Sequence, residues 1–225
     1  CSVTATKAAD ANYNIATSSP LTVTLTKANQ ATLTAVATPS TVQYGATSTL
    51  SSTGGSGTGA VTFSVGASTG CSISGGTTLN VVDVGGTCSV TATKAADNNY
   101  NIATSAPINI TLTAKPITVT ANNASKTYGA TDPTFTYSSS DLGAIFTGSL
   151  SRDAGESAGI YAITQGDLSA GANYSITFVG ASFTINNPVP VLNSISPTST
   201  LAGGTDFVLT ATGSGFVPSS TIKWN

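Results

Sequence analysis

The segment CSVTATKAADANYNIATS (residues 1–18) returns as CSVTATKAADNNYNIATS (residues 88–105), 87 positions later in the chain. The likeness continues from SSPLTVTLT (18–26) to SAPINITLT (105–113), with Leu and Val exchanged for Ile. Apolar positions stay apolar and polar positions stay polar, as expected when one face of each strand packs into a core. A period of this length is too long for a solenoid repeat and predicts tandem β-sandwich domains.

This repeat sets the expected domain organisation. Residues 1–27 are predicted to be the C-terminal part of one domain, and residues 28–114 the complete next copy. Within that copy, alternating apolar and hydroxyl residues separated by Gly-rich turns predict short strands and no helix. The expected strands span 31–37, 48–52, 60–66, 78–82, 88–93 and 108–113. About seven such strands indicate a Greek-key sandwich.

Composition excludes several classes of protein. Only 7% of the residues are charged, His is absent, and the formal net charge is −2. A hydrophobic content of 40%, arranged in alternation, argues against disorder. No apolar run approaches the roughly 20 residues that cross a bilayer, and thinly spread Lys and Arg offer no basic stripe for nucleic acid. We therefore expect an all-β chain with hydroxyl-rich solvent faces, taken from a longer protein and incomplete at both ends.

The chain has three cysteines, Cys1, Cys71 and Cys88. Cys71 and Cys88 flank the expected strand at 78–82, so that they can come within bonding distance. A disulfide between them is the favoured interpretation, and two buried free thiols are the alternative. Cys1 is the repeat equivalent of Cys88, so its partner would lie about 17 residues upstream by the repeat alignment. Without His or a C-x-x-C motif, a catalytic or redox role for Cys1 is disfavoured.

From Lys115 onward the sequence has a different pattern of motifs. Five motifs in this part of the chain resemble the MBG domain found in tandem in large bacterial surface proteins. These motifs, called the marks below, are KTYG (126–129), DPTFTY (132–137), GIYAI (159–163), NYSITF (173–178) and SFTI (182–185). The residues of these marks fit turns and core strands: Tyr128–Gly129 and Asp132–Pro133 are turn pairs. Alternation places the following residues in the predicted core: Phe135, Tyr137, Ile160, Tyr161, Ala162, Ile163, Tyr174, Ile176 and Phe178. Residues 115–187 are therefore predicted to form an MBG-like domain.

Two further segments resemble other extracellular modules. Residues 188–225, which include the end of the linker NNPVPV (186–191), resemble the start of an IPT/TIG domain. The resemblance lies in SISP, the GGT turn, FVLTATG and GSGFVPSSTIKWN. This resemblance implies that Phe207, Leu209 and Ala211 face inward and that Trp224 begins to cap the core. Residues 1–114 resemble bacterial Ig-like tandem repeats more loosely, through the stretch 28–50 with its YGATSTL.

The sequence offers few residues that could form a catalytic or metal-binding site. The nine carboxylates are Asp10, Asp83, Asp97, Asp132, Asp141, Asp153, Glu156, Asp167 and Asp206. No two of these carboxylates form a convincing pair for glycoside hydrolysis. Because the chain has no His, it also has few candidates for a general base. The loop with Asp97, Asn98 and Asn99 offers oxygen ligands for Ca²⁺, although an Asx turn explains the same residues and is favoured. We expect no enzyme, no cofactor and at most this one Ca²⁺ site.

Three N-x-S/T sequences, at Asn109, Asn123 and Asn173, are candidate glycosylation sites and arise easily in Ser/Thr-rich sequence. The expected function is a non-catalytic structural segment, a stalk or filament, of a large bacterial extracellular, adhesin-like protein. Its expected partners are neighbouring repeats of the same polypeptide and other copies in a filament, with no nucleic acid and no membrane insertion. The alternatives are a glycan- or protein-binding adhesion module and a filament subunit assembled by strand complementation.

Overall fold

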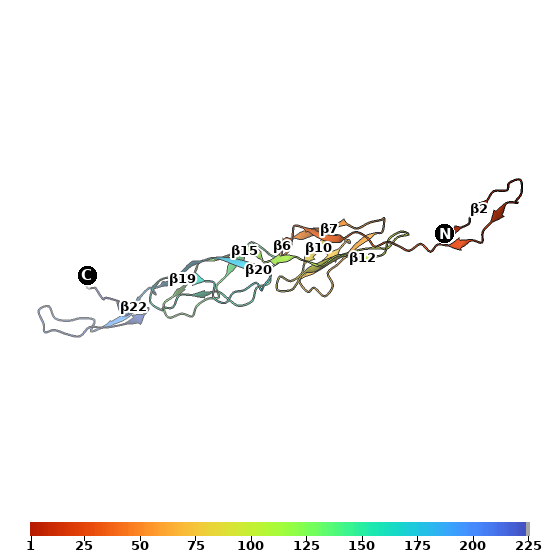
Figure 1. Ribbon diagram of the computed structural model, residues 1–225. Coiled ribbons are helices and arrows are strands. Elements are labelled where there is room, and N and C mark those ends of the chain that lie inside the picture. The colour runs from red at the N-terminus through yellow and green to blue at the C-terminus, as the bar shows by residue number, and fades with distance from the viewer. Residues whose placement is uncertain (224–225) are drawn as a thin grey trace. The chain divides into compact units, whose positions relative to one another are not determined.

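The computed structural model describes residues 1–223 and confirms the predicted all-β fold (Figure 1). No helix occurs among these residues, so none of them forms a helix able to span a membrane. The chain divides into two compact units, Cys1–Lys115 and Pro116–Asn225. Each unit is described separately below, and the finer domain boundaries stay a prediction.

The first sheet of the Cys1–Lys115 unit has the strand order β5-β7-β10-β9. Its strands are β5 (Leu33–Thr38), β7 (Thr47–Gly54), β10 (Thr78–Val81) and β9 (Cys71–Ser74), and all neighbouring pairs are antiparallel. Along β5 the buried residues alternate with exposed ones, because Leu33, Ala35 and Ala37 point to the core while Thr34 and Thr38 face solvent.

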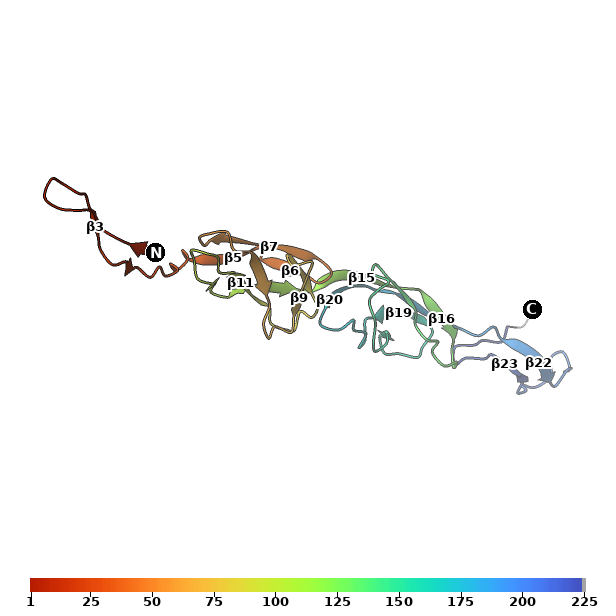
Figure 2. The same ribbon diagram turned by 90° about the vertical axis from the view of Figure 1, so that its right-hand side faces the viewer.

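The second sheet is built around β11 (Ser89–Lys94), which is labelled in Figure 2. β11 pairs antiparallel with β8 (Val61–Ser64), β12 (Ala103–Thr104) and β13 (Ile108–Asn109). A separate parallel pair joins β14 (Thr111–Thr113) to β6 (Thr41–Gln43). Strands β6, β9 and β12 were not predicted, and β6 and β12 are too short, at three and two residues, to show a period of two. The predicted strand 108–113 is interrupted at Ile110, which turns into the core.

The core between these sheets draws on both of them. Its buried residues are Ala37, Val42, Leu50, Cys71, Leu79, Val81, Cys88, Val90 and Ile110. The Cys71–Cys88 disulfide is present, with Cα atoms 5.5 Å apart, and lies inside this cluster. The disulfide therefore joins the edge strand of the first sheet to the start of β11 in the second.

Residues 1–27 form one hairpin with two short paired stretches, one inside the other, and these repeat the geometry of residues 88–114. β1 (Ser2–Val3) pairs with β4 (Leu21–Thr22), and β2 (Thr6–Lys7) pairs with β3 (Ala16–Thr17). These registers match those of β11 with β13 and β12. Every residue of the segment is nevertheless exposed, and Cys1 is a free thiol.

The Pro116–Asn225 unit contains two sheets between Lys115 and Asn186. One has the order β17-β15-β20, with β17 (Tyr137–Ser139), β15 (Lys115–Ala121) and β20 (Tyr174–Val179). The other has the order β16-β21-β19-β18, with β16 (Ala124–Thr127), β21 (Ala181–Asn186), β19 (Gly159–Thr164) and β18 (Ser151–Arg152). Between them lie Val119, Ala121, Leu150, Ile163, Leu168, Phe183 and Ile185.

Most core residues predicted for this segment pack against that cluster. Phe135, Tyr137, Tyr161, Ile176 and Phe178 do so, and Ile163 is fully buried. The prediction was wrong for Ile160, which is 74% exposed, and for Ala162. A strand at the surface of a sandwich buries only one of its faces, and β19 turns Tyr161 and Ile163 inward.

The remaining described residues form a single hairpin, β22 (Val191–Ser196) with β23 (Thr210–Ser214). Leu209 and Ala211 are partly buried as predicted, but Phe207 is 44% exposed, because the hairpin has no opposing sheet among the described residues. Trp224 lies outside the described residues, so its predicted capping role is not addressed.

The cysteine arrangement predicts a specific thiol count. Unfolding the intact chain in denaturant without a reductant should expose one reactive thiol, Cys1, and reduction should raise the count to three. Replacing both Cys71 and Cys88 with Ser opens a loop with a sequence separation of 17 and should cost about 3 kcal/mol of unfolding free energy in urea. Cys1→Ser serves as the control and should leave that free energy unchanged.

Candidate functional site

The first and last segments of residues 28–114, which are predicted to be a complete repeat, run side by side in the same direction. We call this contact the terminal seam (residues 28–44 against 99–113). Isolated parallel bridges join Ala28 to Tyr100 and Thr34 to Ala106. The parallel pair of β6 with β14 continues the seam. The incoming and outgoing segments of the repeat are thereby bonded together from the Ala28–Tyr100 bridge to the Gln43–Thr113 pair.

Hydrogen bonds close the seam at both of its ends. At one end the Ala28 N–H donates to the Asn99 carbonyl at 2.8 Å, and the Asn101 N–H donates to the Ala28 carbonyl at 2.9 Å. At the other end the Thr111 N–H donates to the Ser40 carbonyl at 3.0 Å, and the Tyr44 N–H donates to the Thr113 carbonyl at 2.8 Å. The seam depends on backbone groups, so many side chains are compatible with it.

Gln30 reinforces the seam from within. Its amide nitrogen donates to the carbonyls of Ala95 and Asn101, at 3.2 and 2.8 Å, and its amide oxygen accepts the Ser56 N–H at 3.1 Å. One side chain thus links the incoming segment to the turn before β8 and to the loop after β11.

The predicted calcium candidate, Asp97, lies beside this junction in the loop after β11. Its Oδ1 accepts the N–H groups of Asn99 and Tyr100 at 2.8 and 2.9 Å, and its Oδ2 accepts the Thr58 N–H at 2.7 Å. The Asn99 and Thr58 N–H groups lower the pKa of Asp97 from its usual value. Within residues 1–223 no three acidic, Cys or His side chains gather as a metal site would require. Asp97 forms the Asx turn that was the alternative to the Ca²⁺ site, and the Ca²⁺ site itself stays an untested prediction.

Gly57 makes the Asp97 contact possible. It has φ of +70°, and a Cβ at this position would lie 1.9 Å from Asp97 Oδ2. Glycine is therefore required for the 54–59 turn to approach the carboxylate.

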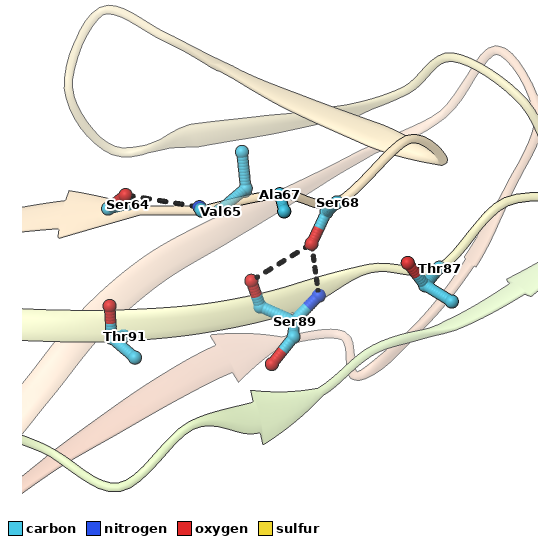
Figure 3. Close-up of a pocket in the computed structure, with 8 residues that line it drawn as sticks. Ser64, Val65, Ala67, Ser68, Thr87, Ser89 and Thr91 are labelled. Atoms are coloured by element: carbon cyan, nitrogen blue, oxygen red, sulfur yellow. Dashed lines mark hydrogen bonds between the residues drawn. The ribbon is translucent and has the colours of Figure 1, made fainter.

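Two hollows on the described part of this unit are lined by no charged side chain. One of about 300 Å³ is lined mainly by hydroxyl side chains and small residues between β8 and β11 (Figure 3). The Ser68 hydroxyl there accepts the Ser89 N–H at 2.9 Å and lies 3.3 Å from the Ser89 carbonyl, to which it donates. These bonds join the loop after β8 to β11, so the polar groups at the centre of the hollow already bond to one another.

The predicted glycosylation sites occupy different environments. Asn109 and Asn123 are exposed, whereas Asn173 is partly buried. The Asn123 side-chain oxygen accepts the Ser182 N–H at 2.9 Å. Their modification stays a prediction.

An ion cluster that sequence reasoning missed lies in the Pro116–Asn225 unit. Lys126 Nζ is 2.7 Å from Asp132 Oδ1 and 2.5 Å from Glu156 Oε2. Arg152 donates from Nε to Asp132 Oδ2 at 2.6 Å and also binds Glu156. The Lys126 side chain is only 4% exposed, and the Arg152 guanidinium lies 5.0 Å from the centre of the buried Phe183 ring. Two cations held against an aromatic core are thus neutralised by two carboxylates from loops.

Electrostatics in the cluster favour the charged forms of all four groups. Bonds from Arg152, and then from Lys126, lower the pKa of Asp132 to about 2. Bonds from Lys126 and Arg152 lower the pKa of Glu156, and bonds from Asp132 and Glu156 raise the pKa of Lys126. The protonated Lys126 amine is not a nucleophile, and each of the two carboxylates bonds both cations, so the cluster is suited to fastening loops. Lys126 and Asp132 stand in the KTYG and DPTFTY marks, where sequence reasoning noted turn chemistry but not their charges.

Comparison with known proteins supports one part of the sequence reasoning. A family model described as MBG domain (YGX type) matches residues 117–184. That segment of the chain is therefore similar to the MBG family, as its motifs indicated. No curated protein and no solved structure matches the chain significantly. The Ig-like and IPT/TIG resemblances stay predictions.

The cluster predicts a pH dependence of stability. Because the pKa of Asp132 and Glu156 is lower in the folded protein, the stabilisation is complete above their unfolded pKa of about 4. It should be lost as the pH falls through that value towards about 2. Calorimetric unfolding of the full chain should show the transition of this unit moving to lower temperature over that window. Asp132→Asn should lower that temperature at pH 7 and flatten the dependence, whereas Asp153→Asn, a carboxylate outside the cluster, should reproduce the wild-type curve.

The Asp97 turn has a matched control inside the chain. Asp10, its repeat equivalent, accepts the Asn12 and Tyr13 N–H groups through Oδ1, but no turn equivalent to Thr58 meets it among the described residues. Asp97→Ala should therefore lower the urea midpoint of the Cys1–Lys115 unit, whereas Asp10→Ala should leave it in place. Equal effects of the two substitutions would contradict this role of the Thr58 contact. A midpoint that rises with added Ca²⁺ and falls in a chelator would favour the Ca²⁺ site instead.

Proposed function

We propose that this chain is a non-catalytic, tension-bearing spacer segment of a large bacterial extracellular or surface protein. Support comes from the internal repeat, from the all-β fold and from the match of residues 117–184 to the MBG family. The buried Cys71–Cys88 disulfide fits an oxidising compartment outside the cytosol. The hydroxyl-rich, weakly charged surface suits a segment that needs to be little more than soluble.

The terminal seam is the observation that carries the proposal. Since β6 and β14 are parallel, the chain enters the repeat at one end of the seam and leaves at the other. Tension between the two ends then slides the two segments past each other and loads several hydrogen bonds at once. A hairpin pulled from its open end would lose its bonds singly and at lower force.

The same arrangement recurs in the MBG-like segment. β16 and β21 pair in parallel from Ala124 opposite Phe183 to Thr127 opposite Asn186, and the Tyr128 N–H donates to the Asn186 carbonyl at 2.8 Å. β21 is also the last strand of that segment before the linker. Both complete segments thus bond an early strand in parallel to their last strand, which supports a shared role under load.

Single-molecule pulling on the full chain from its two ends tests the proposal. The disulfide holds Cys71 and Cys88 together, so the loop between them is shielded from the force until it is reduced. Rupture of the complete repeat is therefore identified by an extra extension of about 6 nm in reductant, from a sequence separation of 17 at about 3.5 Å per residue.

Two proline variants distinguish seam strength from general stability. Thr111→Pro removes the donor to Ser40 within the seam, and Val82→Pro, at a position inside the shielded loop, removes the donor to Gly70, the residue before Cys71. Each loses one backbone hydrogen bond, worth about 1 kcal/mol. Thr111→Pro should lower the rupture force of the oxidised repeat, and Val82→Pro should leave it near wild type. A Thr111→Pro rupture force equal to that of wild type would overturn the tension-bearing role.

A further inference from the structure

The apolar face of residues 1–27 is an exposed copy of a face that is buried elsewhere in the same chain. Val90 is fully buried, whereas its equivalent Val3 is 53% exposed. Cys88 and Ile110 are likewise buried, whereas Cys1 is exposed and Val23 is 43% exposed. The first ten residues of the two copies are identical, so their difference in exposure comes from whether another segment covers them.

The backbone of residues 1–27 already has the conformation that the buried copy adopts. The Val23 N–H donates to the Cys1 carbonyl at 2.7 Å, as the Ile110 N–H does to the Cys88 carbonyl at 2.9 Å. The Ala5 N–H donates to the Ser18 hydroxyl at 2.9 Å, as the Ala92 N–H does to the Ser105 hydroxyl at 2.9 Å. The exposed face therefore needs no rearrangement to accept what covers its copy.

We propose that residues 1–27 are a docking surface for a repeat segment with the sequence chemistry of residues 28–87. A segment of this kind supplies a strand like β8. In the complete repeat β8 pairs antiparallel with β11, from Thr91 opposite Ser64 to Lys94 opposite Val61. The equivalent open edge on the exposed copy runs from Thr4 to Lys7.

The internal copy also specifies the polar contacts that the occupant makes. A turn like 54–59 offers an N–H to Asp10 Oδ2, as Thr58 does to Asp97. A serine in the position of Ser68 bonds the backbone of Ser2, as Ser68 bonds Ser89 at 2.9 Å. These contacts fix the register of the incoming segment to within one residue.

A cysteine in the position of Cys71 then lies beside Cys1. Two thiols form one disulfide, and the two electrons and two protons pass to a disulfide oxidant such as oxidised glutathione, which leaves as two thiols. The Cys71–Cys88 bond shows this geometry in the complete copy.

A second copy of this chain is a poorer occupant. Its residues 28–87 are already covered by its own residues 88–114, through the β8–β11 ladder and the disulfide. An exchange between chains would have to break both, whereas a repeat segment without its own last strands has that surface free. The proposal does not depend on the tension-bearing role.

The test is a fusion in which residues 28–87 precede the full chain, refolded in a glutathione redox buffer. The expected product has no free thiol, a mapped disulfide between the added Cys71 and Cys1, and amide protection at Val3 similar to that at Val90. A matched fusion carrying Phe63→Asp in the added copy places a charge on the strand opposite Ala5. It should leave Cys1 reactive and Val3 unprotected.

The other outcomes count against the proposal. The proposal would be overturned by two free thiols in the fusion or by a disulfide from the added Cys71 to Cys88. It would also be overturned if the added segment did not fold, because the same sequence folds against residues 88–114. A concentration-dependent dimer of the unfused chain, with Cys1 joined to a second copy, would overturn it in favour of that occupant.

Discussion

The structure depends on one constraint: the apolar face of a β-strand must be covered by an opposing sheet. The same sequence meets this constraint once and fails to meet it once within the chain. Residues 88–97 are covered by strands from residues 28–87, so that Val90 and Ala92 are fully buried. Residues 1–10 form the same hairpin hydrogen bonds without such a cover, and they stay exposed. Local hydrogen bonding thus shapes the segment, and tertiary packing decides whether it becomes part of a core.

Covering the strands in this way also determines how the repeat connects to its neighbours in the sequence. Its last segment runs parallel to its first segment, which places Ala28 beside Tyr100 and β6 beside β14. The fastening groups are mostly backbone amides, supplemented by Gln30 and Asp97. A chain with 7% charged residues can therefore be stabilised by hydrogen bonds and packing. The MBG-like segment adds a different fastening, in which Lys126 and Arg152 hold two loops over Phe183.

Much of the fold could be predicted from the sequence, and the reasons are local. Strands such as Leu33–Thr38 and Ser89–Lys94 alternate with a period of two, and the positions of Cys71 and Cys88 on either side of an expected strand indicated their disulfide. Burial of Ile160 was wrongly predicted, because periodicity defines two faces and does not say which one is covered. The seam and the ion cluster could not be predicted, since each joins residues far apart in sequence. Lys126 and Glu156, for instance, are 30 positions apart and meet only through the order of the strands.

Residue-by-residue amide hydrogen exchange of the two copies tests this account most directly. Residues 1–10 and 88–97 have the same sequence, so their intrinsic exchange rates are nearly equal and any difference reports tertiary structure. The account predicts strong protection from Val90 to Lys94 in the native chain and rapid exchange from Val3 to Lys7. Equal protection of the two copies would contradict it, because the opposing sheet would then not be what distinguishes them.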